Sequence, residues 1–133
     1  MSKVFADTFY FLALMNPGDK AHEQAFAFSN DYRGLVVTTA WVVTEVGDAF
    51  CSPPFRPAFL NLIKILEANS AFYVHPPNSE LFAQGIDLFR RRPDKAWSLT
   101  DCISFVLMES EGLTEALTGD HHFEQAGFVA LLK

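Results

Sequence analysis

The stretch "KVFADTFYFLALMN", residues 3–16, joins a β-rich run to a helix-forming run. "KVFAD" is short and apolar and ends in an acid. "TFYFLALMN" has the spacing of an amphipathic helix and stops at Pro17–Gly18, a pair that breaks helices. The stretch therefore predicts a strand followed at once by a helix, with Asp7 at the junction.

The same alternation continues along the chain. Further strands are predicted at residues 34–39, 71–75 and 115–118, with a fifth at 128–132. Helices are predicted at residues 19–32, 40–50, 56–70, 78–92 and 101–110, with a brief one before Gly127. Short strands that alternate with helices imply right-handed crossovers and a mainly parallel sheet covered on both faces. We therefore expect an α/β fold with three layers (α/β/α) around a mainly parallel sheet of four or five strands.

Length and composition indicate a cytoplasmic globular protein. A chain of 133 residues, half of them hydrophobic, is most simply one domain, residues 1–133. The longest early apolar stretch, Phe9–Met15, is far shorter than a membrane span, and Asp7 interrupts the region where a signal peptide needs apolar residues. Cys51 and Cys102 are too few for a disulfide framework and lack metal-ligand spacing, so both are expected to be buried.

The charge of the chain argues at first against a nucleic-acid partner. The net charge is −6, with 16 acids and 10 bases, whereas affinity for phosphate normally comes from Lys and Arg. The bases nevertheless cluster in "RRRPDK", residues 90–95. Divalent cations held by carboxylates would also offset part of the negative charge, so an acidic protein could still bind a polyanion.

Four acids are placed where they could meet. In open parallel sheets, ligands bind beyond the carboxyl ends of the strands, at the point where strand order reverses. Asp7 ends the first predicted strand and Asp120 follows the fourth, so their carboxylates share one crevice if these strands are neighbours. Glu45 borders the apolar stripe of the helix after the second strand, and Asp101 lies in the first turn of the helix after "WSLT".

Each acid also has a purely structural explanation. Asp7 and Asp120 could cap the helices that follow them, and Asp101 completes a Ser-x-x-Asp capping box with Ser98. Glu45 could be a solvated helix position. Four acids on one face would repel one another unless cations or protons intervened, and carboxylate oxygens suit Mg²⁺ or Mn²⁺. Taken together, the acids predict a metal site.

The sequence resembles the PIN-domain family from about residue 3 to its C-terminus. The resemblance rests on four segments, each with one of these acids: "FADTFYFLALMN", "TTAWVVTEVGDAF", "WSLTDCISFVLM" and "LTGDHHFEQAGF". PIN domains are metal-dependent ribonucleases, and small free-standing ones such as this chain are similar to the VapC-type toxins of bacterial toxin–antitoxin pairs. The resemblance implies a PIN-like fold and a catalytic, metal-binding quartet made of Asp7, Glu45, Asp101 and Asp120.

The resemblance also implies a mechanism, in which Mg²⁺ or Mn²⁺ activates a water molecule that hydrolyses an RNA phosphodiester. The chain would then be an endoribonuclease, a hydrolase. We expect Asp7 and Asp101 to be the main metal ligands. Asp120 and Glu45 would complete the site directly or through water, because Mg²⁺ gives up its waters reluctantly.

Other polar residues have less specific assignments. Thr8 and Thr100 match hydroxyl positions that often support the acids in the family. Arg90, Arg91 and Arg92 either favour the dipole at a helix C-terminus or contact the RNA backbone.

The pair His121–His122 beside Asp120 suggests a zinc site. Adjacent histidines do not share a helix face, however, and no further His or Cys lies at ligand spacing. The sequence therefore argues against either histidine as a metal ligand.

Two other classes of function share some of these features. A non-catalytic PIN-like interaction module is the main alternative, and the intact acidic quartet argues against it. A metal-dependent phosphatase of the haloacid-dehalogenase type would carry a second Asp two positions after Asp7, where Phe9 stands instead.

The resemblance implies two partners, an RNA substrate and an antitoxin protein. The antitoxin would pack an apolar helix on the early helices and place an Arg or Lys among the four acids. The early aromatic residues offer more apolar surface than a small domain easily buries, so a homodimer is a further expectation. These residues are Phe9, Tyr10, Phe11, Phe26 and Phe28.

Overall fold

A computed structural model describes residues 2–133, and it contains one five-stranded sheet. The strands are β1 (Lys3–Ala6), β2 (Leu35–Thr39), β3 (Phe72–His75), β4 (Glu115–Leu117) and β5 (Val129–Ala130). Their order across the sheet is β3-β2-β1-β4-β5, and every neighbouring pair is parallel. The central strand β1 thus lies between β2 and β4, which places the reversal of strand order at its carboxyl end.

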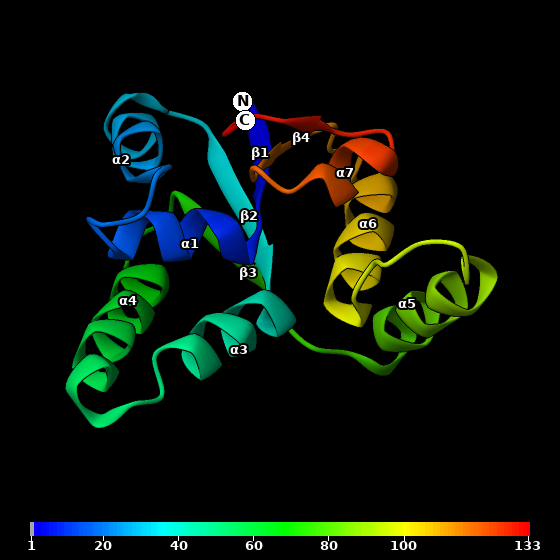
Figure 1. Ribbon diagram of the computed structural model, residues 1–133, viewed down its shortest axis with the longest axis horizontal. Helices are drawn as coiled ribbons and strands as arrows, with labels where there is room; N and C mark the ends of the chain where they lie inside the picture. Colours follow the sequence, from blue (N-terminus) through cyan, green and yellow to red (C-terminus); the bar gives the residue numbers. More distant parts are fainter. Residues whose placement is uncertain (1) are drawn as a thin grey trace.

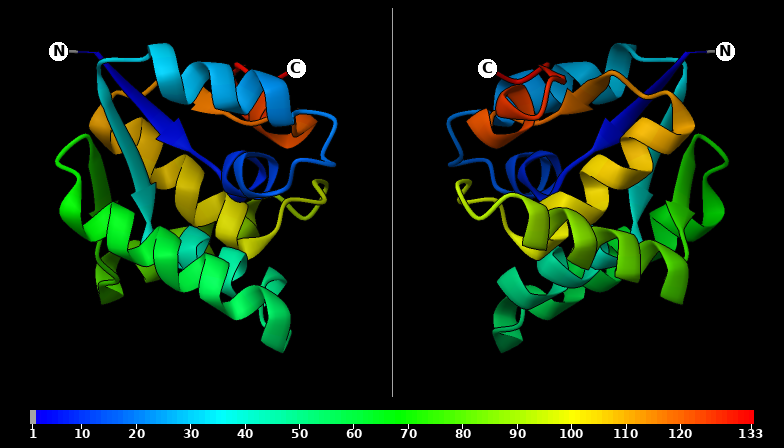
Figure 2. Two further views of the ribbon diagram at one scale, coloured as in Figure 1. Left: turned by 90° about the vertical axis from the view of Figure 1, so that its left-hand side faces the viewer. Right: turned by 90° about the vertical axis from the view of Figure 1, so that its right-hand side faces the viewer.

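Helices cover both faces of this sheet. They are α1 (Thr8–Met15), α2 (His22–Asp31), α3 (Ala40–Ala49), α4 (Arg56–Ala68), α5 (Ser79–Arg91), α6 (Leu99–Glu111) and α7 (His121–Gln125), with a 3-10 turn, η1 (Pro53–Phe55), before α4. Figure 1 shows α1, α2 and α4 on one side of the sheet and α5, α6 and α7 on the other, and Figure 2 shows the same layers from both sides. The α/β/α prediction is confirmed.

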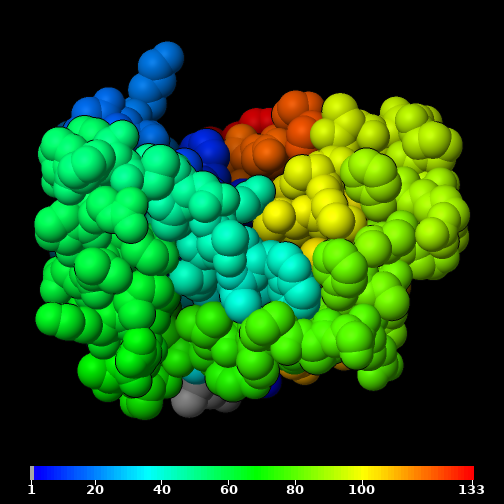
Figure 3. Space-filling view, turned by 90° about the horizontal axis from the view of Figure 1, so that it is seen from below, coloured from blue at the N-terminus to red at the C-terminus, as the bar shows by residue number. Residues whose placement is uncertain are grey.

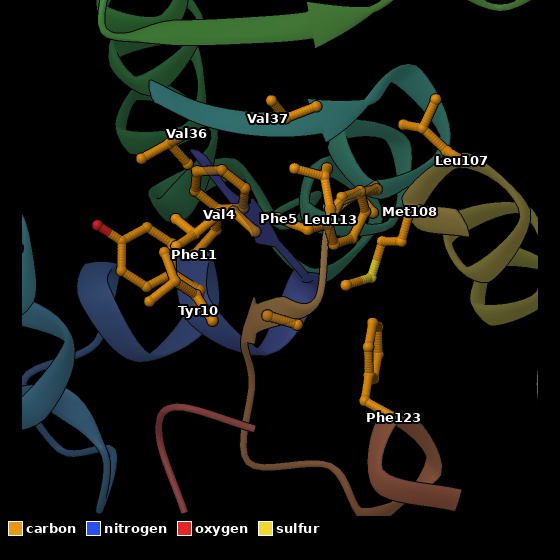
Figure 4. Close-up of a cluster of buried hydrophobic side chains, with 14 of the residues drawn as sticks. Val4, Phe5, Tyr10, Phe11, Val36, Val37, Leu107, Met108, Leu113 and Phe123 are labelled. Carbon is orange, nitrogen blue, oxygen red and sulfur yellow. The ribbon is translucent and has the colours of Figure 1, made fainter. Parts of the chain in front are cut away.

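The core forms because the central strand is buried on both faces. Val4, Phe5 and Ala6 are all inaccessible to solvent, as expected for a parallel strand between two helix layers. Val4 lies beside Phe11 of α1, whereas the ring of Phe5 faces that of Phe123 of α7 at a centroid distance of 6.3 Å (Figure 4). Successive side chains of β1 therefore hold the two helix layers to the sheet.

The expectation about the early aromatic residues was largely wrong. Tyr10 and Phe11 are buried, and Phe9 and Phe28 are partly buried against the core. Of the five, only Phe26 is exposed, at 53%. The other exposed large hydrophobic side chains of residues 2–133 are Phe55, Leu60, Ile65, Tyr73, Phe82, Phe89 and Val129. Residual apolar surface thus lies mainly on later elements, because α1 packs against both β1 and α2.

The expectations about the two cysteines and about membrane spans have different outcomes. Cys102 is buried as predicted, but Cys51 is exposed, because it lies in the turn between α3 and η1 and not inside a helix. Within residues 2–133, no helix combines the length and hydrophobicity that crossing a bilayer requires.

Candidate active site

The strand order brings Asp7 and Asp120 to one edge of the sheet. Strands β1 and β4 are parallel neighbours, with Ala6 opposite Leu117, so their carboxyl ends lie side by side. Asp7 follows β1 directly, and its N–H donates to the Leu117 carbonyl at 3.4 Å. Asp120 follows β4 after a two-residue turn. The condition for Asp7 and Asp120 to share one crevice, that their strands are neighbours, is therefore met.

Helices α3 and α6 add Glu45 and Asp101 to the same edge. Glu45 is half-buried and accepts a 2.5 Å hydrogen bond from the Thr8 hydroxyl, which ties α3 to the start of α1. Asp101 is buried in the first turn of α6. Figure 3 looks at the face toward which β1 and β2 point, where the start of α1 (blue), α3 (teal), the start of α6 (yellow) and α7 (orange) meet.

Electrostatic interactions connect the four acids into one group. Asp7 is only 5% exposed, and its pKa is raised to about 7, mainly by burial. The charges of Asp101 and Glu45 contribute to this rise, whereas the hydrogen bonds from the Thr118 side chain and the Thr8 backbone oppose it. Burial, followed by the charge of Asp120, also raises the pKa of Asp101. The structure therefore brings all four predicted acids together.

The donor set of this group suits a divalent cation. Throughout residues 2–133, no lysine or arginine lies within ion-pair distance of the four acids. In the described part of the chain, the ion-pair partners of these acids are His121 and His122, which are positively charged only when protonated. Buried carboxylates without a basic partner are costly, and hard oxygen ligands are those that Mg²⁺ and Mn²⁺ prefer. The four acids therefore offer ligands that fit the divalent cation predicted from the sequence.

Two of the four acids, Asp101 and Asp120, take part in helix caps as well as in the acidic group. Asp101 forms the capping box with Ser98, and Asp120 accepts the His122 N–H at 2.9 Å, so both cap helices. Asp7 occupies the cap position of α1, but within the described chain its side chain makes no capping bond. Glu45 is not freely solvated, because Thr8 holds it. A carboxylate has more acceptor sites than one capping hydrogen bond uses, so a capping acid can still bind a ligand.

The sequence reading missed Thr118, which connects two of the acids. Its hydroxyl donates to Asp7 Oδ2 at 2.9 Å and accepts the Asp120 N–H at 3.0 Å. Thr118 is completely buried. A threonine two residues before an acid, as in "LTGD", can form such a local turn. The spacing of Thr118 and Asp120 could have indicated this turn from the sequence. The hydrogen bond to Asp7, however, depends on the pairing of β1 with β4.

His122 was also underestimated. Its Nδ1 atom lies 3.2 Å from Asp101 Oδ2 and 3.4 Å from Asp120 Oδ1, so the imidazole sits between these carboxylates. Of the two expected supporting hydroxyls, Thr8 contacts an acid, whereas Thr100 contributes only its carbonyl, which accepts from Ser104, in the described structure.

The three arginines lie apart from the acids, at the exposed end of α5. Arg90 and Arg91 both pair with Asp87, at 3.9 and 2.8 Å, and Arg92 pairs with Asp94 at 3.0 Å. Exposed pairs of this kind contribute little to stability. Their side chains therefore remain available to another anion, and the loop after Arg92 leads directly into the start of α6.

Replacing Thr118 with valine is expected to lower RNA cleavage about 10- to 100-fold, because outer partners that orient metal ligands have effects of this size. The substitution keeps the shape of the side chain and removes the donor to Asp7. Cleavage rates and Mn²⁺ affinity would measure the effect. Thr38→Val is the matched control, since Thr38 is equally buried but donates to the Ala6 carbonyl at 2.8 Å. Equal losses in both variants would contradict a role for Thr118 at the acids.

A family model for the PIN domain matches residues 4–129 of the chain. The chain belongs to the PIN-domain family. This PIN domain is 26% identical over 126 residues to the 23S rRNA-specific endonuclease VapC20 of Mycobacterium tuberculosis strains CDC 1551 and H37Rv, and the match covers 95% of each chain.

Solved structures agree with this assignment. The crystal structure of M. tuberculosis VapC20, a toxin that cleaves the sarcin–ricin loop, superimposes with a TM-score of 0.86 at 25% identity, over 96% of this PIN domain and 97% of that chain. FitAcB from Neisseria gonorrhoeae shares the fold, with a TM-score of 0.66 at 18% identity and coverage of 96% and 94%. The resemblance to PIN domains of the VapC type is thus confirmed.

Proposed function

We propose that the chain, as one PIN domain over residues 1–133, is a metal-dependent endoribonuclease that cleaves ribosomal RNA and serves as the toxin of a toxin–antitoxin pair. The observation that carries the proposal is the group of four acids at the carboxyl edge of the sheet, which has no lysine or arginine partner in residues 2–133. The likeness to VapC20 over nearly the whole chain supports the choice of substrate.

In this proposal Asp7 and Asp101 hold Mg²⁺ or Mn²⁺, and Glu45 and Asp120 complete the site. When bound, the cation would lower the pKa of a water molecule and stabilise charge on the phosphate. Thr118 fixes one oxygen of Asp7 and leaves the other available to the cation. Burial of Asp7 and Asp101 limits the access of bulk water, which would weaken the charges around the scissile phosphate.

The RNA backbone would contact Arg90, Arg91 and Arg92 at the end of α5. A double variant, Arg90→Ala with Arg91→Ala, is expected to raise KM while leaving kcat nearly unchanged, because backbone contacts position the substrate. The slope of log affinity against log salt should fall by about 1 for each arginine removed. Binding measured at several salt concentrations tests this. Arg33→Ala, at the opposite edge of the sheet before β2, is the control and should leave the slope unchanged.

The antitoxin needs an apolar surface near the acids, and we place this surface on α3 and α4, because most of the early aromatic side chains are buried. A hollow of about 530 Å³ lies there, lined among others by Val43, Phe50, Phe59 and Leu60. It borders the helix that carries Glu45, so a segment seated in it could extend an arginine toward the acids.

Leu60→Glu is expected to abolish protection by the antitoxin without reducing cleavage, because the substitution places a charge in the apolar hollow. Expression of the chain alone should slow growth, and co-expression with a small protein encoded next to it should restore growth for the wild type only. Protection of Leu60→Glu equal to that of the wild type would exclude this hollow as the docking surface.

The direct test of the proposed activity uses purified protein, ribosomes and Mg²⁺ or Mn²⁺. Primer extension on 23S rRNA should reveal one new 5′ end in the sarcin–ricin loop. A protein that binds metal but cuts neither ribosomal RNA nor tRNA would be a non-catalytic module instead.

A further inference from the structure

We infer that His121, His122 and Asp120 form a second cation site, beside Asp101, that takes a borderline transition metal such as Co²⁺, Ni²⁺ or Zn²⁺. The inference rests on the proposed function in so far as Asp120 and Asp101 belong to both sites. The second site differs from the first in its ligands. The four acids alone supply only oxygen ligands, whereas the histidines supply nitrogen.

The ligand atoms are spaced as a bound ion requires. His121 Nδ1 lies 3.6 Å from Asp120 Oδ1, and His122 Nδ1 lies 3.4 Å from the same oxygen. One ligand atom from each of these three residues can be chosen so that all lie within 4.8 Å of one another. Ligands ~2.1 Å from a tetrahedral ion lie roughly 3.4 Å apart, which matches both distances. Asp101 Oδ2, 3.2 Å from His122 Nδ1, could supply a fourth ligand.

Adjacent histidines can converge here because they occupy the first turn of α7. Side chains of a helix tilt toward its N-terminus, so those of the first two residues lean toward the cap residue, which is Asp120. The two imidazole rings are accordingly close, with centroids 4.5 Å apart and planes at 52°. Neighbouring histidines face apart inside a helix, but at this terminus both lie near Asp120.

A hydrogen bond alone does not account for the arrangement. The Nδ1 atom of His122 carries at most one proton, yet it faces carboxylate oxygens of both Asp101 and Asp120. His121 Nδ1 is too far from Asp120 Oδ1 to form a hydrogen bond, at 3.6 Å, yet it lies near the same oxygen as His122 Nδ1. A cation between these atoms would satisfy all of them at once.

The four side chains of the proposed site differ in their exposure to solvent. The exposed fractions of the side chains are 12% for Asp101, 20% for His122, 31% for Asp120 and 64% for His121. An ion could therefore enter from the His121 side. Imidazole suits zinc, nickel and similar ions, whereas Mg²⁺ prefers oxygen, so Mg²⁺ held by Asp7 should not displace the ion at the histidines.

The test is a titration of the full chain with Co²⁺ in excess Mg²⁺, monitored by visible absorption of the cobalt. We expect one saturable binding event, weakened at least about tenfold in His121→Ala and in His122→Ala, since each loses a direct ligand. His75→Ala, a half-buried histidine at the end of β3, is the control and should bind like the wild type. Equal Co²⁺ affinity and spectrum in all four proteins would overturn the inference.

A second measurement on the wild type needs no substitution, in case a variant fails to fold. Co²⁺ should shift or broaden the ring proton resonances of His121 and His122 before those of His22 and His75, and an unselective effect would overturn the site. Co²⁺ binding by the histidines without RNA cleavage would remove only the proposed function. Cleavage that depends on Asp7, with no effect of either histidine on Co²⁺ binding, would remove only the second site.

Discussion

Asp7→Asn is expected to reduce RNA cleavage by about 1,000-fold or more, a loss of about 4 kcal/mol in transition-state stabilisation. The amide has nearly the same shape as the carboxylate but lacks the charge that holds the cation. Cleavage of an RNA fragment in excess Mg²⁺ measures the effect. Asp31→Asn, at the exposed end of α2, is the control and should cleave at the wild-type rate.

The same substitution should not unfold the protein. Burial opposes ionisation of Asp7, so a neutral side chain at this position removes an unfavourable charge at neutral pH. The melting temperature of Asp7→Asn without metal is therefore expected to equal or exceed that of the wild type. Substantial cleavage by a folded Asp7→Asn protein would contradict the assignment of Asp7 to the catalytic group.

The metal-free protein is expected to lose stability as pH rises from about 4 to about 7. The pKa of Asp7 is about 7 in the folded chain, against 3.8 as its ordinary value. In this interval the folded state keeps a proton that the unfolded state has released, so the free energy of unfolding falls as pH rises. The contribution of Asp7 is complete below pH 4 and is lost above pH 7. A difference of three units corresponds to about 4 kcal/mol at most.

A divalent cation should reverse this loss at high pH. At pH 8, Mg²⁺ or Mn²⁺ at about 100 times its dissociation constant would raise the free energy of unfolding by about 2.7 kcal/mol. Denaturant unfolding at pH 5 and pH 8, with and without metal, measures both effects. Asp7→Asn should flatten the pH dependence and weaken the response to metal. A wild-type protein that is more stable at pH 8 than at pH 5 without metal would contradict the prediction.

The positions of the acids could be predicted because they follow from local features and one topological rule. Asp7 and Asp120 stand directly after or close to the ends of apolar runs, and parallel strands bring such ends to a common edge. Asp101 could be placed by its capping box, because Ser98 and the spacing to the acid mark the first turn of a helix. These features depend on short stretches of sequence, so periodicity and turn residues are enough to find them.

The contacts that cross the fold could not be predicted in the same way. Thr118 and Asp7 are far apart in sequence, and their hydrogen bond depends on the register in which β4 pairs with β1. Likewise, Tyr10, Phe11 and Leu60 are all apolar in the sequence. Only the packing of α1 and α4 decides that Tyr10 and Phe11 are buried and that Leu60 is exposed. The exposure of a side chain depends on how its helix packs in the fold, and short stretches of sequence do not show this packing.

The most direct test of the acidic metal centre is chelation and rescue of RNA cleavage with one preparation of the wild-type protein. A 23S rRNA fragment that contains the sarcin–ricin loop should be cut at one position in Mg²⁺ or Mn²⁺. The cut should disappear on adding EDTA and return when the cation is restored in excess. Asp101→Asn should not be rescued at the same cation concentration. Cleavage that persists in EDTA, or is equally strong in Asp101→Asn, would contradict the claim that the four acids hold the cation on which cleavage depends.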